Sequence, residues 1–116
     1  METLVIPPEM VAAANREHGL KGRVKRGATR EPIIQDGQVV GFYTPHFAAN
    51  GRMRVGPIYV APEFRGRGAA TSVYTEIQGP MMAAIRDDMP DSIRMHERAG
   101  FQKWRRFQWG WYWKRD

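Results

Sequence analysis

The chain is constrained most by residues 55–71, which read Val-Gly-Pro-Ile-Tyr-Val-Ala-Pro-Glu-Phe-Arg-Gly-Arg-Gly-Ala-Ala-Thr. The β-forming residues at the start of this stretch predict a strand, and the residues after Gly68 predict a helix with its apolar side chains on one face. The loop between them contains two glycines, which let backbone N–H groups close around an anion, and a helix start adds unpaired N–H groups of its own. Taken alone, the stretch fits either a pyrophosphate site or a surface turn with solvated arginines.

Turn and cap signals divide the rest of the chain into short elements. The sequence predicts a helix from Pro8 to His18 and a loop over Leu20–Arg30. Asp36-Gly37 and Asn50-Gly51 predict tight turns between three antiparallel strands, at 32–35, 39–45 and 53–60. Pro57 lies inside the third strand, where a proline is typical of an edge or a bulge.

The second half of the chain alternates between helical and strand patterns. A helix is expected over 68–78, followed by a strand over 81–85 whose continuous apolar run is typical of burial on both faces. Asp88 is expected to cap the next helix, which runs to Ala99. The remaining residues, 101–114, predict a strand that places Trp109, Trp111 and Trp113 on one side.

Length and composition exclude several classes of protein. A chain of 116 residues has room for one hydrophobic core, so we expect one domain. It has no cysteine, which excludes disulfides, thiolate metal sites and a Cys nucleophile. Three scattered histidines (His18, His46 and His96) make a poor metal site, so no metal is expected. No apolar run approaches the ~20 residues of a membrane helix, and the start lacks a secretory signal, so we expect a cytoplasmic protein without membrane contact.

Basic charge is concentrated at the two ends of the chain. Residues 1–30 carry a net +3, residues 31–92 a net −2, and residues 93–116 a net +5, which together give +6. The last thirteen residues of the chain contain six aromatic ones among their basic residues, namely Trp104, Phe107, Trp109, Trp111, Tyr112 and Trp113. These aromatics either fill the core beneath terminal strands or stack on bases while the cations contact phosphates. The charge fits a polyanionic partner or a solvated basic surface equally well.

Two motifs resemble those of the GNAT superfamily of acyl-CoA N-acyltransferases. Residues 58–70 (Ile-Tyr-Val-Ala-Pro-Glu-Phe-Arg-Gly-Arg-Gly-Ala-Ala) resemble its V-x-P-x-[YF]-R-G-x-G strand and R/Q-x-x-G-x-G/A signature. Residues 92–101 (Ser-Ile-Arg-Met-His-Glu-Arg-Ala-Gly-Phe) resemble its S-I-R-L-Y-E-K-L-G-F block, and Asp36-Gly37 with Gly41-Phe42 resembles its D-G-x-x-V-G strand pair. The resemblance spans about residues 31–107, with both motifs in order and in the expected context.

The resemblance implies an α+β fold, with a mixed, mostly antiparallel central sheet and helices on both faces, as a single domain over 1–116. It implies acetyl-CoA as co-substrate, with its pantetheine arm inserted where the strands Met53–Val60 and Met81–Ile85 splay apart. Backbone groups of Ile58, Tyr59 and Val60 are expected to hold the arm. The pyrophosphate is expected on the backbone amides of Arg65, Gly66, Arg67, Gly68, Ala69 and Ala70.

The chain departs from the family pattern at two positions. His96 stands where the family often has a tyrosine general acid, and a histidine there can protonate the departing thiolate, act as a base, or merely pack against the sheet. Met89 replaces an asparagine that the family commonly shows. The general base stays open among Tyr43, His46, Asp87, Asp88 and a water relay, because Glu63 lies beside the phosphates, where a base is of little use.

The chain is close to a minimal member of the superfamily, with few loops to enclose a small substrate, which suggests a phage or mobile-element enzyme. We therefore expect a large anionic acceptor, such as an aminomethyl-type modified pyrimidine in DNA. N-acetylation of a protein lysine or N-terminal amine is the alternative. A non-catalytic nucleic-acid-binding module that retains the fold is a third. The sequence sets neither the oligomeric state nor the acyl-chain preference.

Overall fold

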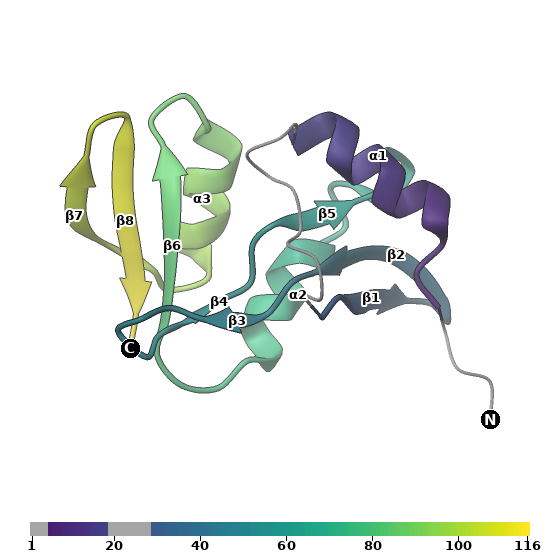
Figure 1. Ribbon diagram of the computed structural model, residues 1–116, viewed down its shortest axis with the longest axis horizontal. Coiled ribbons are helices and arrows are strands. Elements are labelled where there is room, and N and C mark those ends of the chain that lie inside the picture. The colour runs from purple at the N-terminus through teal and green to yellow at the C-terminus, as the bar shows by residue number, and fades with distance from the viewer. Residues whose placement is uncertain (1–4, 19–28) are drawn as a thin grey trace.

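The computed structural model of the chain describes residues 5–18 and 29–116, and it is a mixed α+β fold with three α-helices among them (Figure 1). The first helix, α1 (Pro8–His18), has the predicted bounds. The predicted loop at Leu20–Arg30 lies outside the described residues, except for its last two. Within the described ranges, no helix is long and apolar enough to cross a membrane.

The predicted turn at Asp36-Gly37 joins β1 (Glu31–Gln35) to β2 (Gln38–Tyr43). Both turn residues have positive φ, 52° and 77°, as a tight hairpin turn with the twist of its strands requires. The second predicted turn, at Asn50-Gly51, separates the short strands β3 (His46–Phe47) and β4 (Met53–Arg54). Both turn predictions are confirmed.

The third predicted strand, 53–60, is wrong as a single element. It consists of β4 and β5 (Ile58–Val60), with a break at residues 55–57. The break exists because the two halves have different partners: Met53 pairs with Met81, whereas β5 pairs with β2. The sequence indicated an interruption at Pro57 but could not show that the chain changes sheets there.

The strands form two sheets, ordered β1-β2-β5 and β3-β4-β6-β8-β7. β6 (Met81–Arg86) pairs in parallel with β4 and antiparallel with β8 (Gly110–Arg115), which pairs with β7 (Gln102–Phe107). The β4–β6 contact is the one parallel pair among the described residues. Beyond it, β5 and β6 lie in different sheets and share no ladder; we call the place where these two strands are unpaired the gap.

The predicted single strand over 101–114 is also wrong. It is a hairpin, β7–β8, which turns at Gln108-Trp109, and Trp109 at its tip is 61% exposed. Trp111 and Trp113 do share the face that packs on the core, where Trp113 is buried. The alternation of apolar and polar residues continues through the turn, which is why the pattern concealed it.

Helices cover both faces of the fold. The first helix lies over β2 and β5, where Ala14 packs with Phe42, Tyr59 and Ala61. On the opposite face, α2 (Ala69–Glu76) and α3 (Pro90–Arg98) pack against the larger apolar cluster, which contains Val73, Tyr74, Met81, Ile85 and Trp113. We call the side of α2 and α3 the helix side. The other side is the open face, because no described helix lies there over β6, β8 and β7; Figure 1 draws α3 beside β6, on its far side.

Two local expectations about this half of the chain are corrected. Asp88 does not cap α3; the N-cap is Met89, without a side-chain hydrogen bond, and Asp88 pairs with Arg86 instead. β6 is buried on both faces only at its start: Met82 on the open face is 8% exposed, whereas Ala84 on the same face is exposed. The helix-side residues Met81 and Ile85 are buried as predicted.

Candidate functional site

The loop before α2 presents backbone N–H groups to the outside. Gly66 and Gly68 have φ of 80° and 76°, a backbone conformation that side-chain-bearing residues rarely adopt, and Gly68 is the N-cap of α2. Among the described residues, none accepts a hydrogen bond from the amides of residues 66–70, and the first helical bond runs from Ser72 N–H to the Gly68 carbonyl. Within the described part of the chain, nothing lies within 4 Å of an added Cβ at either glycine, so no described residue fills the space above them.

Arg65, the first arginine of the loop, has a structural role. The Arg65 N–H donates to the Pro62 carbonyl at 3.3 Å, so this amide is already bonded. Its side chain turns back: Nε donates to the Val60 carbonyl at 2.8 Å, and the guanidinium pairs with Glu17 of α1 at 2.6 Å. Arg65 thus joins the loop, β5 and α1, whereas the exposed Arg67 lies over the Phe64 ring and accepts a hydrogen bond from Gln35 at its carbonyl.

β5 has one paired edge and one free edge. The Ala61 N–H donates to the Val40 carbonyl, and because backbone groups alternate along a strand, Tyr59 also turns its N–H and C=O toward β2. Ile58 and Val60 turn theirs toward the gap facing β6. The strands approach closely on the paired side, since a Cβ at Gly41 would lie 2.0 Å from the Tyr59 carbonyl oxygen.

His96 lies inside the helix-side core. It is 4% exposed, and its ring packs against Tyr74 and Phe101 with centroids 5.1 and 5.0 Å away. Nδ1 donates to the Ser92 carbonyl at 2.7 Å, so Nε2 accepts the hydrogen bond from the Tyr74 hydroxyl at 2.9 Å. Burial lowers the pKa of His96, an effect that the Ser92 hydrogen bond partly offsets, and burial raises the pKa of Tyr74. This geometry is that of a packed, neutral histidine; its catalytic role stays a prediction.

Of the four candidate bases, three are engaged elsewhere. Asp87 and Asp88 pair with Arg106 and Arg86 on the surface. Tyr43 packs against the helix-side core, and burial, with Glu31 and Glu76 nearby, raises the pKa of its hydroxyl.

His46 is exposed, and its Nδ1 lies 3.0 Å from the Thr44 carbonyl oxygen. Because a carbonyl oxygen only accepts hydrogen bonds, Nδ1 is the donor in this contact. Thr44 itself was missed by the sequence analysis. It is 4% exposed, and its hydroxyl has no hydrogen-bond partner among the described residues.

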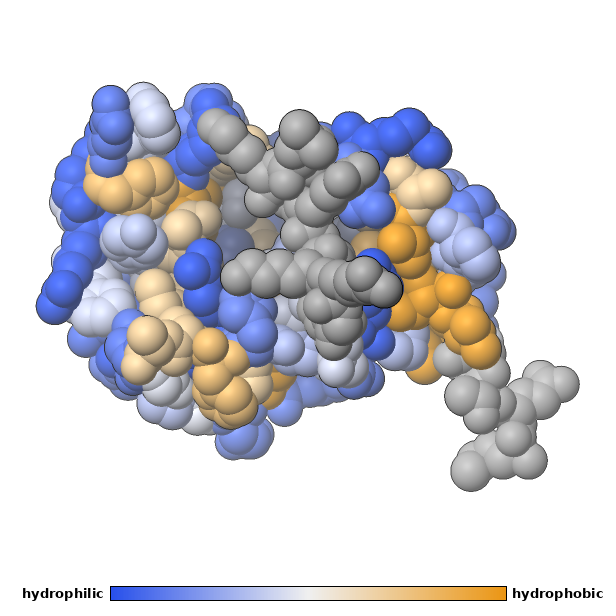
Figure 2. All heavy atoms as spheres, viewed as in Figure 1, coloured by the Kyte–Doolittle hydropathy of each residue, from blue (hydrophilic) through white to orange (hydrophobic). Residues whose placement is uncertain are grey.

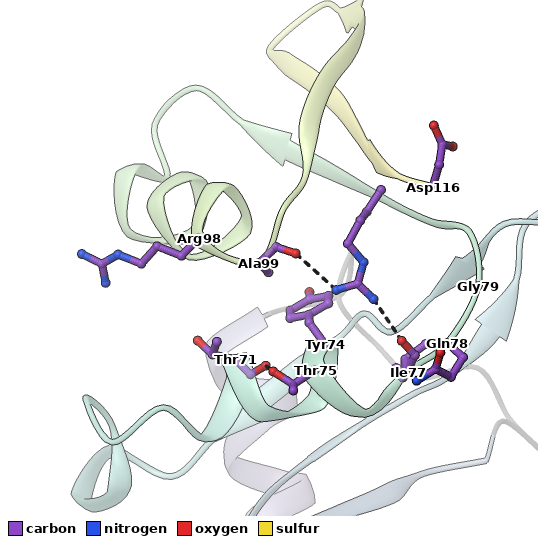
Figure 3. Close-up of a pocket in the computed structure, with 10 residues that line it drawn as sticks. Thr71, Tyr74, Thr75, Ile77, Gln78, Gly79, Arg98, Ala99 and Asp116 are labelled. Atoms are coloured by element: carbon purple, nitrogen blue, oxygen red, sulfur yellow. Dashed lines mark hydrogen bonds between the residues drawn. The ribbon is translucent and has the colours of Figure 1, made fainter.

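A polar groove of about 450 Å³ lies between α2 and α3 on the helix side (Figure 3). Thr71 in the first turn of α2 and Arg98 in the last turn of α3 both line it. Arg115 crosses the groove and donates to the Ala99 carbonyl at 3.2 Å and the Ile77 carbonyl at 3.1 Å (Figure 3). One guanidinium therefore bonds the C-terminal ends of both helices, where a cation also interacts favourably with the helix dipoles.

The open face of the β6–β8–β7 sheet carries cations and aromatics. Residues paired across the strands put Ala84, Tyr112 and Arg105 on this side, opposite the core-facing Trp111 and Trp113. Trp104, at a bulge in β7, has three cations over its ring within 5.5 Å, from Arg52, Arg105 and Lys114.

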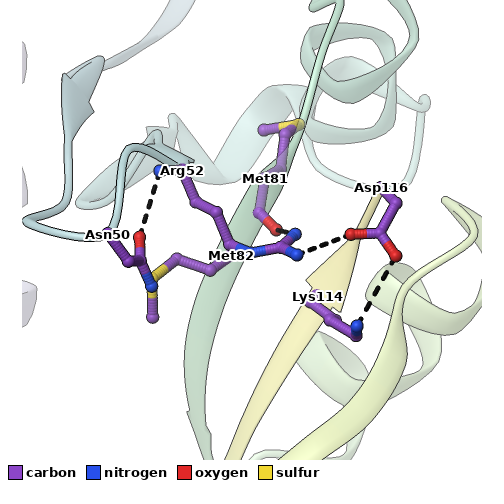
Figure 4. A network of polar contacts seen from close by, with 6 residues as sticks. All are labelled: Asn50, Arg52, Met81, Met82, Lys114 and Asp116. Atoms are coloured by element: carbon purple, nitrogen blue, oxygen red, sulfur yellow. Dashed lines mark hydrogen bonds and ion pairs between the residues drawn. The ribbon is translucent and has the colours of Figure 1, made fainter.

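Arg52 and Lys114 share Asp116, at 2.6 and 3.5 Å, and Arg52 also donates to the Met81 carbonyl (Figure 4). Figure 2 shows hydrophilic residues interspersed with apolar ones at this end of the molecule, and a larger apolar patch around the start of α1.

The described residues contain no group of three or more His, Cys, Asp or Glu side chains that could hold a metal ion. A search of curated proteins found no match to the chain. The family model of the Acetyltransferase (GNAT) family matches residues 23–101, which include the glycine loop, the gap between β5 and β6, and α3. The chain therefore belongs to the GNAT acetyltransferase family and is an acetyl-CoA-dependent N-acetyltransferase.

Proposed function

We propose that the chain transfers an acetyl group from acetyl-CoA to a primary amine carried by a nucleic acid. The observation that carries the acceptor class is the open face, where Arg52, Arg105 and Lys114 lie over the ring of Trp104. Cations supply phosphate contacts, and aromatic rings supply stacking surfaces for bases. An aminomethyl-type pyrimidine in DNA meets both requirements, and such hypermodification implies a cytoplasmic, phage-type setting.

The residues of the loop fit the coenzyme. Five consecutive amides, from Gly66 to Ala70, have no acceptor among the described residues and lie under open space, which suits a pyrophosphate. Bound acetyl-CoA supplies an acetyl thioester, whose carbonyl carbon is the site of amine attack. The free-edge amides of Ile58 and Val60 are donors available to the arm and to the thioester oxygen.

The two arginines of the motif take different parts in this proposal. Arg65 orients the loop through Val60 and Glu17, and the solvent-exposed Arg67 is available to a phosphate. Thr71 and Arg98 extend the polar surface from the first turn of α2 into the groove, and they are further candidates for the nucleotide half of the coenzyme.

The acceptor has one side from which to approach the gap. The helix side is filled by the packed rings of Tyr74, His96 and Phe101. The other side is bordered by the small, exposed Ala84 and leads to the cationic surface. An amine held there reaches the thioester without displacing the core.

The test measures transfer of labelled acetyl groups to three probes. These are a single-stranded thymidine oligonucleotide with one 5-aminomethyl-deoxyuridine, the same oligonucleotide without it, and a lysine peptide of equal length. We expect label on the first probe alone, and a transfer rate that falls steeply with salt because phosphate contacts release counterions. Label on the peptide alone would favour the protein-amine alternative.

A paired variant tests the surface that carries the proposal. Arg105→Gln with Lys114→Gln removes two of the cations around Trp104 and is expected to raise KM for the oligonucleotide while leaving acetyl-CoA affinity unchanged. Gly68→Glu should abolish the acetyl-CoA-dependent rise in Tm, because it puts a carboxylate and a strained φ at the loop. If acetyl-CoA does not raise the wild-type Tm while DNA binds, the non-catalytic binding module is the correct reading.

A further inference from the structure

Amine attack requires a group that removes a proton from the ammonium form, and β3 pairs with β4, the strand at whose end β5 and β6 separate. His46 pairs directly with Arg54 of β4, the last residue before the chain leaves β6. Met53, which precedes Arg54, packs on the helix-side core. Because side chains alternate along a strand, Arg54 and the His46 opposite it face the other side. Directly opposed residues have Cβ atoms about 5 Å apart. The His46 side chain therefore lies next to Arg54, at the end of β4 where the gap begins.

The orientation of the ring is fixed by the backbone. Because a carbonyl can only accept, the 3.0 Å contact between His46 Nδ1 and the Thr44 carbonyl requires the proton on Nδ1. Nε2 then carries the lone pair, and the side chain is exposed. Catalytic histidines commonly use this arrangement: one ring nitrogen donates to an orienting group, here the Thr44 carbonyl, and the other carries the lone pair that accepts a proton.

A second polar group lies on the same side. Thr44 follows β2, and its N–H donates to the Val55 carbonyl at 3.0 Å, so it is bonded directly to the break between β4 and β5. Phe42 lies two residues before Thr44 and packs toward α1. Because side chains alternate along a strand, Thr44 is expected on the same face as Phe42. Its buried hydroxyl has no partner among the described residues, and such groups in native proteins usually serve a ligand, a water or a catalytic step.

We propose that His46 is the general base of the acetyl transfer and that Thr44 Oγ1 holds the amine, or the water next to it, in line with His46 Nε2. This rests on the proposed function. The attacking ammonium loses two protons in all. The first passes to Nε2 and then to solvent, the nitrogen bonds to the acetyl carbon, the carbon–sulfur bond breaks, and sulfur leaves with the electron pair and takes the second proton. Arg54 is the charged group that faces His46 from the strand packed against it.

The experiment compares His46→Gln with Phe47→Gln, which makes the same change at the next position of β3, where the side chain is 71% exposed. We expect His46→Gln to lower kcat about 10²- to 10⁴-fold with the aminomethyl oligonucleotide, with acetyl-CoA affinity within about twofold of wild type. The deficit should shrink as pH rises toward the pKa of the amine itself, near ~10 for an alkylamine, because free amine then needs no base. Imidazole should restore part of the rate to His46→Ala.

Two results would overturn the proposal. The first is a His46→Gln enzyme whose kcat stays within about threefold of wild type and Phe47→Gln, against the 10²-fold minimum expected of a general base. The second is independent of activity: ¹⁵N spectra of the imidazole that show the proton on Nε2 rather than Nδ1. If the wild-type chain acetylates neither the oligonucleotide nor the peptide, the proposed function alone fails, and the ¹⁵N spectra still decide which His46 nitrogen carries the proton.

Discussion

Replacing Thr44 by valine should make the protein more stable and less active. Valine has almost the same shape and the same preference for strands, but it has no hydroxyl to leave without a partner. An unsatisfied buried hydroxyl costs about 1–3 kcal/mol, and Thr44 is 4% exposed with its Oγ1 unpartnered. For a chain of 116 residues the entropy of unfolding is about 0.24 kcal/mol/K, so we expect Tm to rise by about 4–12 °C.

Calorimetry and the acetyl-transfer assay together test this prediction. Thr75→Val is the matched change at an exposed threonine of α2, and its stability should stay within about 0.5 kcal/mol of wild type. A Tm that is unchanged or lower in Thr44→Val would refute the reasoning, since the hydroxyl would then be satisfied in solution. A more stable enzyme with unchanged kcat would keep the stability argument but remove Thr44 from the site.

Three further predictions concern the loop and the helix-side core. Gly68→Ala should weaken acetyl-CoA binding and lower the free energy of unfolding, measured by urea denaturation, by about 1–2 kcal/mol. The cost comes from backbone strain alone, because an added Cβ meets none of the described atoms within 4 Å. Arg115→Met should destabilise by about 2–4 kcal/mol, since it leaves the Ala99 and Ile77 carbonyls unbonded, whereas Arg115→Lys should cost less; urea titrations compare the two. Burial lowers the pKa of His96, so below about pH 6.5 the unfolded chain binds a proton that the folded chain does not. The free energy of unfolding should therefore fall by up to about 1.4 kcal/mol per pH unit as the pH is lowered. In His96→Gln, Tm measured between about pH 7 and 5.5 should not show this dependence.

The elements that the sequence predicted well are those decided by local geometry. Asp36-Gly37 and Asn50-Gly51 require positive φ within a few residues, so the turns could be identified without knowing what the strands pair with. The start of α2 was equally local, because Gly68 both ends the loop and caps the helix. The α+β class and the family followed from these turns together with the two motifs.

The elements that were missed depend on partners far along the chain. The break at residues 55–57 arises because Met53 pairs with Met81 while Ile58 pairs with Tyr43, and no pattern within the stretch contains that information. The division of β7 from β8 was hidden by continuous alternation through Trp109.

Contacts of single side chains were equally beyond the sequence. It placed Arg65 near an anion by its charge, yet Val60 and Glu17 hold the guanidinium. The motif aligned His96 with the position where the family often has a tyrosine. It could not show that the Tyr74 hydroxyl donates a hydrogen bond to His96 Nε2.

The candidate site is the part of the molecule where polar groups are left without protein partners. The amides of residues 66–70, the N–H groups of Ile58 and Val60 on the free edge of β5, and the hydroxyl of Thr44 have no acceptor or partner among the described residues. Native proteins pair nearly all buried polar groups, so the buried Thr44 hydroxyl calls for a partner from outside the chain, while the exposed amides at the start of α2 are available to an anion. A variant that paired these groups internally would close the gap between β5 and β6. It would gain stability and lose the binding of acetyl-CoA together with the approach of the amine.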